Sequence, residues 1–136
     1  MNKAKRPPEQ LDTGVSEFGD RMAQLLLDVR AASGAVLSDE QGDPIDAARR
    51  VNRIEEIDVQ IAGAQIGQCV ALLNRNSLVF GLGSPVVIAE SARGMLIAKP
   101  LQHSYLFTLV MDRRTSLSQT LARFEEAAAD LDELMR

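Results

Sequence analysis

The sequence predicts an α+β domain, a three-layer sandwich in which a five-stranded antiparallel sheet lies between helices, in the order helix, strand, strand, helix, strand, strand, strand, helix. Two observations predict this class. Three segments carry apolar side chains at helical spacing, and five short apolar runs are separated by turn residues. The 136 residues, 46% of them hydrophobic, have the length and composition of one globular domain.

The N-terminal residues differ in composition from the rest of the chain. Residues 1–14 combine charged residues, two prolines and a glycine with few apolar side chains, which predicts a flexible arm ahead of a domain at 15–136. We expect a first helix over about 16–32, with Ser16 as the N-cap candidate and Gly34 ending it. Its apolar face would consist of Phe18, Met22, Leu25, Leu26 and Val29.

A β-hairpin is predicted next, with strands over 35–38 and 44–48. Gly42 can supply the positive φ that such a tight turn requires, and the Asp39 side chain can accept hydrogen bonds from the turn backbone. Asp39 and Asp43 also form the best carboxylate pair for Ca²⁺. The further acidic ligands of a calcium loop are missing, so we interpret the pair as part of a turn.

Residues 54–74 predict a helix with two apolar stripes instead of one. The narrower stripe contains Ile54, Ile57, Ile61, Ala64 and Leu72, and the broader one contains Val59, Ala62, Ile66, Cys69, Val70 and Leu73. A helix that is apolar on two sides needs two surfaces to pack against. One can be the sheet of its own domain, and the other must be another helix of the chain or a second copy of the protein.

Two glycines, Gly63 and Gly67, lie four residues apart inside this predicted helix. Each costs about 1 kcal/mol relative to alanine, so close packing must compensate. Small residues at this spacing let another helix approach, but close packing of the helix on its own sheet explains them equally well. The sequence leaves both explanations open.

The last part of the chain predicts three antiparallel strands and a helix. The apolar runs 86–89, 95–98 and 105–111 contain consecutive apolar residues, which indicates strands buried on both faces. Ser116 and Gln119 have capping-box spacing, and apolar residues then recur at steps of four and three almost to Arg136. We therefore expect a final amphipathic helix beginning at Ser116.

Composition argues against several classes of protein. No run of 18 apolar residues and no signal-peptide pattern occurs, so we expect a cytoplasmic protein without membrane insertion. A net charge of −4 and an aromatic content of 4% argue against nucleic-acid binding. Arg49, Arg50 and Arg53 form only a local cluster, which we expect to face solvent or a partner protein.

No constellation of catalytic residues can be identified, and we expect no enzymatic activity. The one histidine, His103, is expected in a surface loop without a carboxylate near it in sequence to orient it as a general base. Cys69 is expected to be a small buried hydrophobic residue. One cysteine and one histidine cannot form a structural zinc site, so we predict no metal and no cofactor.

The hairpin at 35–48, with its Asp-x-x-Gly turn followed by a proline, resembles the characteristic segment of the roadblock (dynein light chain) family, which has a profilin-like fold. The strands at 86–98 and 105–111 and the terminal helix resemble the rest of that fold, so the resemblance covers about residues 16–136. The basic arm and the segment 112–116, where relatives more often have an Asn/Gly turn, depart from the pattern.

The resemblance implies a non-catalytic homodimer in which the middle helices pair antiparallel and the third predicted strands, 86–90, meet edge to edge. The implied dimer interface is Ile54, Ile57, Ile61, Ala64, Val86 and Ile88. It also implies regulation of a small Ras-like GTPase, as in the bacterial members, with the partner across the paired helices at Glu56, Gln60, Gly67, Ala71 and Asn74. The alternative is a structural adaptor or light-chain-type subunit of a motor or larger assembly.

Overall fold

The computed structural model describes residues 10–79, 81, 83 and 85–136. Its elements follow the predicted order with one strand added at the beginning: β1 (Leu11–Asp12), α1 (Glu17–Asp28), β2 (Ala32–Ser38), β3 (Pro44–Arg50), α2 (Glu56–Val79), β4 (Val87–Ser91), β5 (Gly94–Pro100), the short 3₁₀ helix η1 (Gln102–Ser104), β6 (Leu106–Met111) and α3 (Leu117–Leu134). The strands form one antiparallel sheet in the order β1-β3-β2-β6-β5-β4.

The sheet has six strands, so the prediction of five was wrong. The additional strand β1 comes from the predicted arm, where Leu11 pairs with Arg50 and Asp12 pairs with Arg49. The expectation of a flexible arm is therefore wrong for these two residues, while its residues 1–9 lie outside the described part of the chain.

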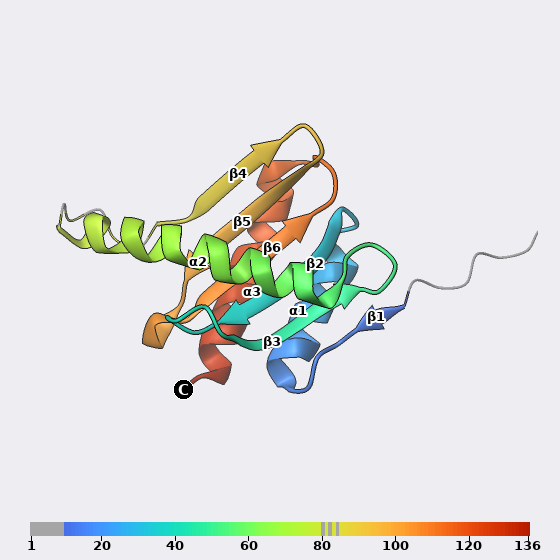
Figure 1. The fold of residues 1–136 in the computed structure, drawn as a ribbon, viewed down its shortest axis with the longest axis horizontal. Helices are drawn as coiled ribbons and strands as arrows, with labels where there is room; N and C mark the ends of the chain where they lie inside the picture. Colours follow the sequence, from blue (N-terminus) through green and yellow to red (C-terminus); the bar gives the residue numbers. More distant parts are fainter. Residues whose placement is uncertain (1–9, 80, 82, 84) are drawn as a thin grey trace, which may run out of the picture.

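Helices cover both faces of the sheet, as the three-layer prediction requires (Figure 1). α2 crosses the front face over β2, β3, β5 and β6, whereas α1 and α3 lie side by side behind it. The main core lies between this helix pair and the sheet, where the rings of Phe107 and Phe124 stack with their centroids 4.6 Å apart. α2 extends past the sheet, so part of its length has no element of its own chain beneath it.

α1 ends at Asp28, earlier than expected, and Gly34 lies inside β2 and does not end the helix. The backbone is already extended at Val29, with φ −120° and ψ 98°. All seven residues of β2 are buried because this strand lies between β3 and β6 under helices on both faces. We attribute the early end of α1 to the burial of β2, because a longer α1 would leave fewer residues for this buried strand.

Arg50 contradicts the expectation that the arginine cluster faces solvent or a partner. It is buried, its Nε donates to the Ala32 carbonyl oxygen at 2.8 Å, and its Nη2 donates to that of Leu26. Leu26 lies in the last turn of α1, where carbonyl groups lack partners inside the helix. Arg49 also bonds within its own chain, donating to the Ile54 carbonyl oxygen at 3.0 Å. Arg50 thus joins the end of α1 to the start of β2.

The start of α1 is held by a carboxylate from another strand. Asp46 of β3 is buried and accepts hydrogen bonds from the Val15 and Gly19 amides, each at 3.0 Å. Ser16 is the N-cap residue, as expected, but its hydroxyl makes no bond to the helix and donates to Asp46 instead. One carboxylate therefore satisfies backbone donors that a local cap would otherwise serve.

The predicted hairpin is confirmed. Gly42 has φ +86°, and the Asp39 Oδ1 atom accepts from the Gln41 and Asp43 amides at 2.9 Å each. At the last helix the prediction holds only in part, because α3 begins after Ser116 but the Ser116 side chain makes no capping bond.

The two glycines of α2 pack against the protein's own sheet. A Cβ at Gly63 would lie 2.7 Å from Val36 Cγ1 and 2.8 Å from Ser38 Oγ, and one at Gly67 would lie 3.1 Å from Leu106 Cδ2. Of the two explanations left open by the sequence, close packing of the helix on its own sheet is the one the structure supports.

Gly63→Ala is expected to lower the free energy of unfolding by about 1–3 kcal/mol through overpacking, although alanine is the better helix former. Gly67→Ala is the matched control, because its Cβ would meet only the flexible end of Leu106, and we expect a change below about 1 kcal/mol. Denaturant unfolding at one protein concentration measures both variants. Equal losses would contradict this explanation of Gly63.

Candidate interaction surface

The outer face of α2 is apolar and exposed. Ile57 is 58% exposed, Ile61 is 43% exposed and Leu72 is also exposed, while Val59 and Val70 on the opposite side are buried against the sheet. These positions agree with the predicted division of the helix into two apolar stripes. Large aliphatic side chains at consecutive turns of a helix are unusual on a surface that remains in water.

Some members of the two stripes lie elsewhere than predicted. Ile54 is half-buried, and Ala64 lies beneath the hairpin turn, where a Cβ at Gly42 would be 3.3 Å from its Cβ. Conversely, Cys69 and Leu73 are exposed, so the prediction of a buried cysteine was wrong. The line along which α2 contacts the sheet is narrower than the predicted broad stripe. It runs through Val59, Gly63 and Val70.

β4 forms a second exposed apolar region at one edge of the sheet. Val86 and Ile88 are exposed, and of the residues of β4 only Val87 is half-buried. The prediction that all three late strands are buried on both faces is therefore wrong for β4. An apolar edge strand with unpaired backbone groups is a ready template for another strand.

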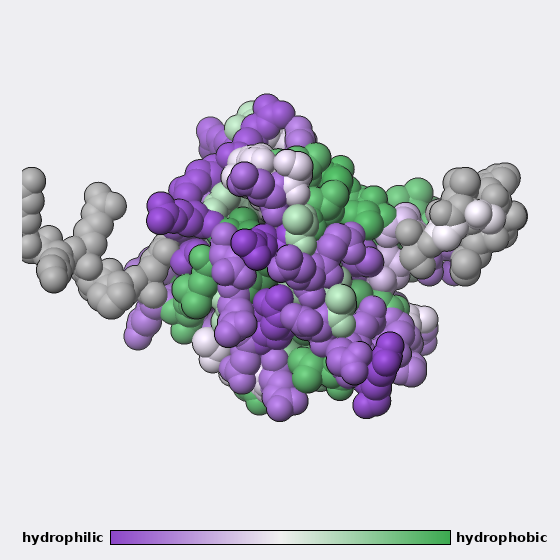
Figure 2. All heavy atoms as spheres, turned by 180° about the vertical axis from the view of Figure 1, so that it is seen from behind, coloured by the Kyte–Doolittle hydropathy of each residue, from purple (hydrophilic) through white to green (hydrophobic). Residues whose placement is uncertain are grey.

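The far end of α2 lies toward the same side of the molecule as β4, whereas the first turns of α2 lie over β2 and β3. We call the exposed apolar residues of α2, Val86 just before β4 and Ile88 within it together the α2–β4 surface: Ile57, Ile61, Leu72, Leu73, Val86 and Ile88. α2 projects beyond the sheet on the side where β4 forms the edge (Figure 1). Seen from behind, hydrophobic residues gather toward this projecting end, whereas the face formed by α1 and α3 is mostly hydrophilic (Figure 2).

The positions predicted for a partner fall into two groups along α2. Glu56 and Gln60 line a pocket of about 240 Å³ against β3, and Ala71 and Asn74 line one of about 300 Å³. Gly67 lines the second pocket too, but it faces Leu106 of β6 and not outward as expected.

The described residues contain no group of three or more His, Cys, Asp or Glu side chains placed to hold a metal ion. His103 is exposed in η1, with a left-handed backbone at φ 61°, and its ring makes an edge contact with Tyr105. None of the described helices is long and apolar enough to cross a membrane.

No family model and no curated protein matches the sequence. Solved structures do match. MglB of Myxococcus xanthus superposes with a TM-score of 0.75 at 21% identity, over 88% of this chain and 95% of that one. A Roadblock/LC7 domain from Streptomyces avermitilis gives 0.72 at 13% identity, over 85% and 94%. The chain has the roadblock/LC7 fold.

The fold expected from the hairpin resemblance is thus confirmed. The gliding protein MglB from Thermus thermophilus also matches, with a TM-score of 0.73 at 14% identity over 85% of this chain and 86% of that one. Identities this low establish the roadblock fold alone, so function has to be argued from the surface of this chain.

Proposed function

We propose that this roadblock-fold protein is a non-catalytic, homodimeric interaction module that binds and regulates a small Ras-like GTPase. The observation that carries the proposal is the α2–β4 surface, which a single chain leaves exposed to water. The shared fold with MglB structures and the resemblance of the hairpin to the roadblock family support a GTPase as the partner.

A second copy of the chain is the occupant that fits the α2–β4 surface best. Antiparallel pairing of two α2 helices would bury Ile57 and Ile61 of both copies, and edge-to-edge pairing of two β4 strands would continue the sheet. Both contacts are self-complementary, as a two-fold interface requires. Pairing would also remove an apolar edge that otherwise promotes aggregation.

The GTPase would lie across the paired helices, at the predicted partner positions Glu56, Gln60, Ala71 and Asn74. A dimer that binds one nucleotide state of a GTPase more tightly shifts the population of that state by its differential affinity, without donating a catalytic residue. The experiment is a pull-down of the Ras-like GTPases of the source organism, each loaded with GDP or with a non-hydrolysable GTP analogue. Capture of neither form of any of them would contradict the regulator proposal.

Ala71→Arg is expected to weaken GTPase binding at least about tenfold while the dimer stays intact, because it places a long charged side chain on the exposed side of α2. Ala129→Arg is the matched control, since Ala129 is also an exposed alanine within a helix, on α3. Titration calorimetry with the captured GTPase measures affinity, and light scattering measures the mass. Equal affinities of the two variants would place the partner away from α2.

A structural subunit of a larger assembly is the second candidate. The observation that favours it is the second half of α2, where Leu72 and Leu73 are exposed. α2 also projects beyond the sheet (Figure 1). Such a subunit would purify with a large complex, and its binding would not depend on the nucleotide state of any GTPase.

A further inference from the structure

Exposed side chains form a regular row along the outer side of α2. Each follows the previous one by three or four residues in strict alternation, the spacing that keeps side chains on one face of a helix and forms the contact line of a coiled coil. We call this row the α2 seam: Asp58, Ile61, Gln65, Gln68, Leu72 and Arg75.

The chemical character of the α2 seam is mirrored about its middle, which falls between Ile66 and Gly67. On each side of this midpoint come first a glutamine, then a large aliphatic residue, then a charged residue. The charged residues have opposite signs, since Asp58 stands at the beginning and Arg75 at the end. The row is therefore the same in both directions in size and polarity, and it reverses only in charge.

A two-fold axis through this midpoint would bring matching groups of two copies together. In an antiparallel pair of identical helices, each residue contacts the residue at the same distance on the other side of the axis. Aliphatic side chains would then meet aliphatic ones, amides would meet amides that can both donate and accept, and an acid would meet a base. The pairs are Ile61 with Leu72, Gln65 with Gln68, and Asp58 with Arg75, each formed twice.

The charged ends of the α2 seam have no partners within one chain. The side chains of Asp58 and Arg75 form no ion pair or hydrogen bond with any residue that the structure describes. They lie about 25 Å apart along the helix, so they cannot pair with each other in one copy. Parallel helices would bring like charges together, which favours the antiparallel orientation.

The two glutamines distinguish between registers. Sliding one copy along the other by seven residues would set Gln65 against Ile61, or Gln68 against Leu72. The amide at that contact would then lose its hydrogen-bond partner, which is unfavourable in a buried position. Polar residues at such positions set the register of coiled coils at a cost in stability.

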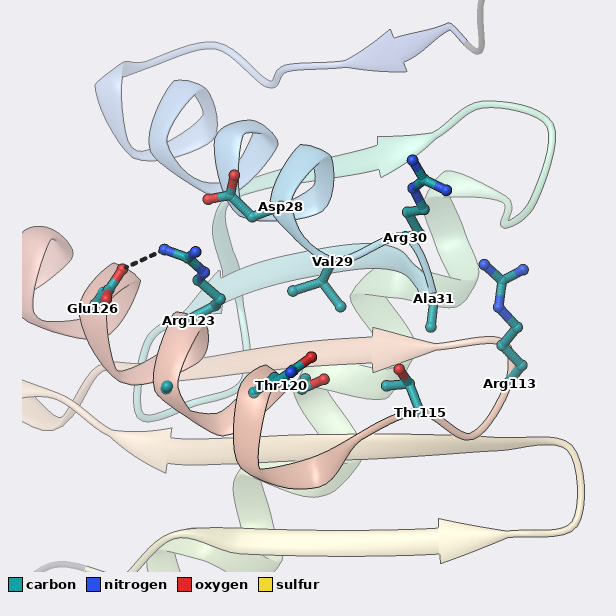
Figure 3. A pocket seen from close by; sticks show the side chains of 11 residues that line it. Asp28, Val29, Arg30, Ala31, Arg113, Thr115, Thr120, Arg123 and Glu126 are labelled. Atoms are coloured by element: carbon teal, nitrogen blue, oxygen red, sulfur yellow. Dashed lines mark hydrogen bonds and ion pairs between the residues drawn. The ribbon is translucent and has the colours of Figure 1, made fainter.

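α1 and α3, which the structure describes from end to end, carry no such row on the opposite face. Each exposes one large aliphatic residue, Leu27 and Leu134 respectively. A pocket of about 770 Å³ lies between the end of α1 and the beginning of α3, and charged and polar residues make up most of its walls (Figure 3). Arg123 and Glu126 of this pocket pair with each other at 3.4 Å. The self-complementary pattern is therefore a feature of α2.

We propose that the α2 seam selects a second copy of this chain in one antiparallel register, with Asp58 of each copy paired with Arg75 of the other. The proposal rests on the homodimer of the proposed function and adds the residues that determine its orientation and register. An exposed ion pair contributes little affinity, so the aliphatic residues supply most of the binding. The charges and the glutamines supply selectivity.

The test exchanges the charges at the ends of the α2 seam. In Arg75→Glu each outer contact joins two acidic groups, and in Asp58→Arg each joins two basic groups. We expect either variant alone to raise the dissociation constant of the homodimer at least about tenfold at low salt, measured by analytical ultracentrifugation. Mixing the two variants restores both ion pairs. The mixed dimer should bind within about threefold of the wild type and dominate the mixture in native mass spectrometry.

Asp20→Arg mixed with Arg75→Glu is the matched control. Asp20 is an exposed aspartate in the first turn of α1, as Asp58 is in the first turn of α2, but it lies away from the α2 seam. This mixture should contain the mixed dimer no more often than random exchange of copies gives.

A dimeric wild type whose Arg75→Glu and Asp58→Arg variants show only random exchange would overturn the proposed register and leave the homodimer standing. A wild type that is monomeric at every concentration would overturn the homodimer as well.

Discussion

Replacing Ile57 and Ile61 together by aspartate is expected to convert the protein from a dimer to a monomer in solution. Each isoleucine buried at an interface contributes about 1.5–3 kcal/mol, and two-fold symmetry places both residues in the interface twice. The new carboxylates would in addition have to leave water. We therefore expect the dissociation constant to rise at least about a thousandfold. Multi-angle light scattering over a dilution series measures the change.

Leu27→Asp is the matched control for this experiment. Leu27 is 63% exposed on α1, so the same change of an exposed aliphatic residue to aspartate is made away from the α2–β4 surface. This variant should remain a dimer. A wild type that is already monomeric would contradict the proposed dimer, and a double variant with the mass of a dimer would move the interface away from α2.

The hairpin and α2 could be predicted because their signals are local. Gly42 and Asp39 determine a turn within a few residues, and the two apolar stripes of α2 repeat over several turns. The strand β1 could not be predicted in the same way. It contains only Leu11 and Asp12, which is too short for a periodic pattern, and it exists because the edge of β3 pairs with it.

The burial of β4 was mispredicted for a different reason. A run of apolar residues shows that a strand avoids water, but it does not show whether the cover is the same chain or another molecule. Val86 and Ile88 look like core residues in the sequence and lie at an exposed edge in the structure. This disagreement is informative, because it locates the surface where a second copy is proposed.

Contacts between residues distant in sequence account for most of the remaining differences. Arg50 bonds to the carbonyl groups of Leu26 and Ala32, and Arg113 shares a pocket with Arg30, yet no short motif connects these residues.

Asp46→Ala is expected to lower the free energy of unfolding by about 3–5 kcal/mol. The Asp46 carboxylate accepts from the Val15 and Gly19 amides and from the Ser16 hydroxyl, and its removal leaves these donors without that partner at the start of α1. The Gly19 bond is buried, and a buried donor left unsatisfied costs about 1–3 kcal/mol. The Val15 and Ser16 bonds are half-buried and add smaller losses. Chemical denaturation at one fixed protein concentration measures the loss, because dimerisation makes stability depend on concentration.

The matched control is Asp43→Ala, which removes an exposed carboxylate from the turn of the same hairpin and should cost less than about 1 kcal/mol. Asp46→Asn separates the effect of charge from that of shape, because the asparagine oxygen can still accept from one or two of the donors. The free energy of unfolding that this variant loses should fall between the losses of Asp43→Ala and Asp46→Ala. Amide exchange should rise first in α1, since its beginning is anchored by Asp46. If both alanine variants lost equal stability, the start of α1 would have to be held by contacts other than this carboxylate.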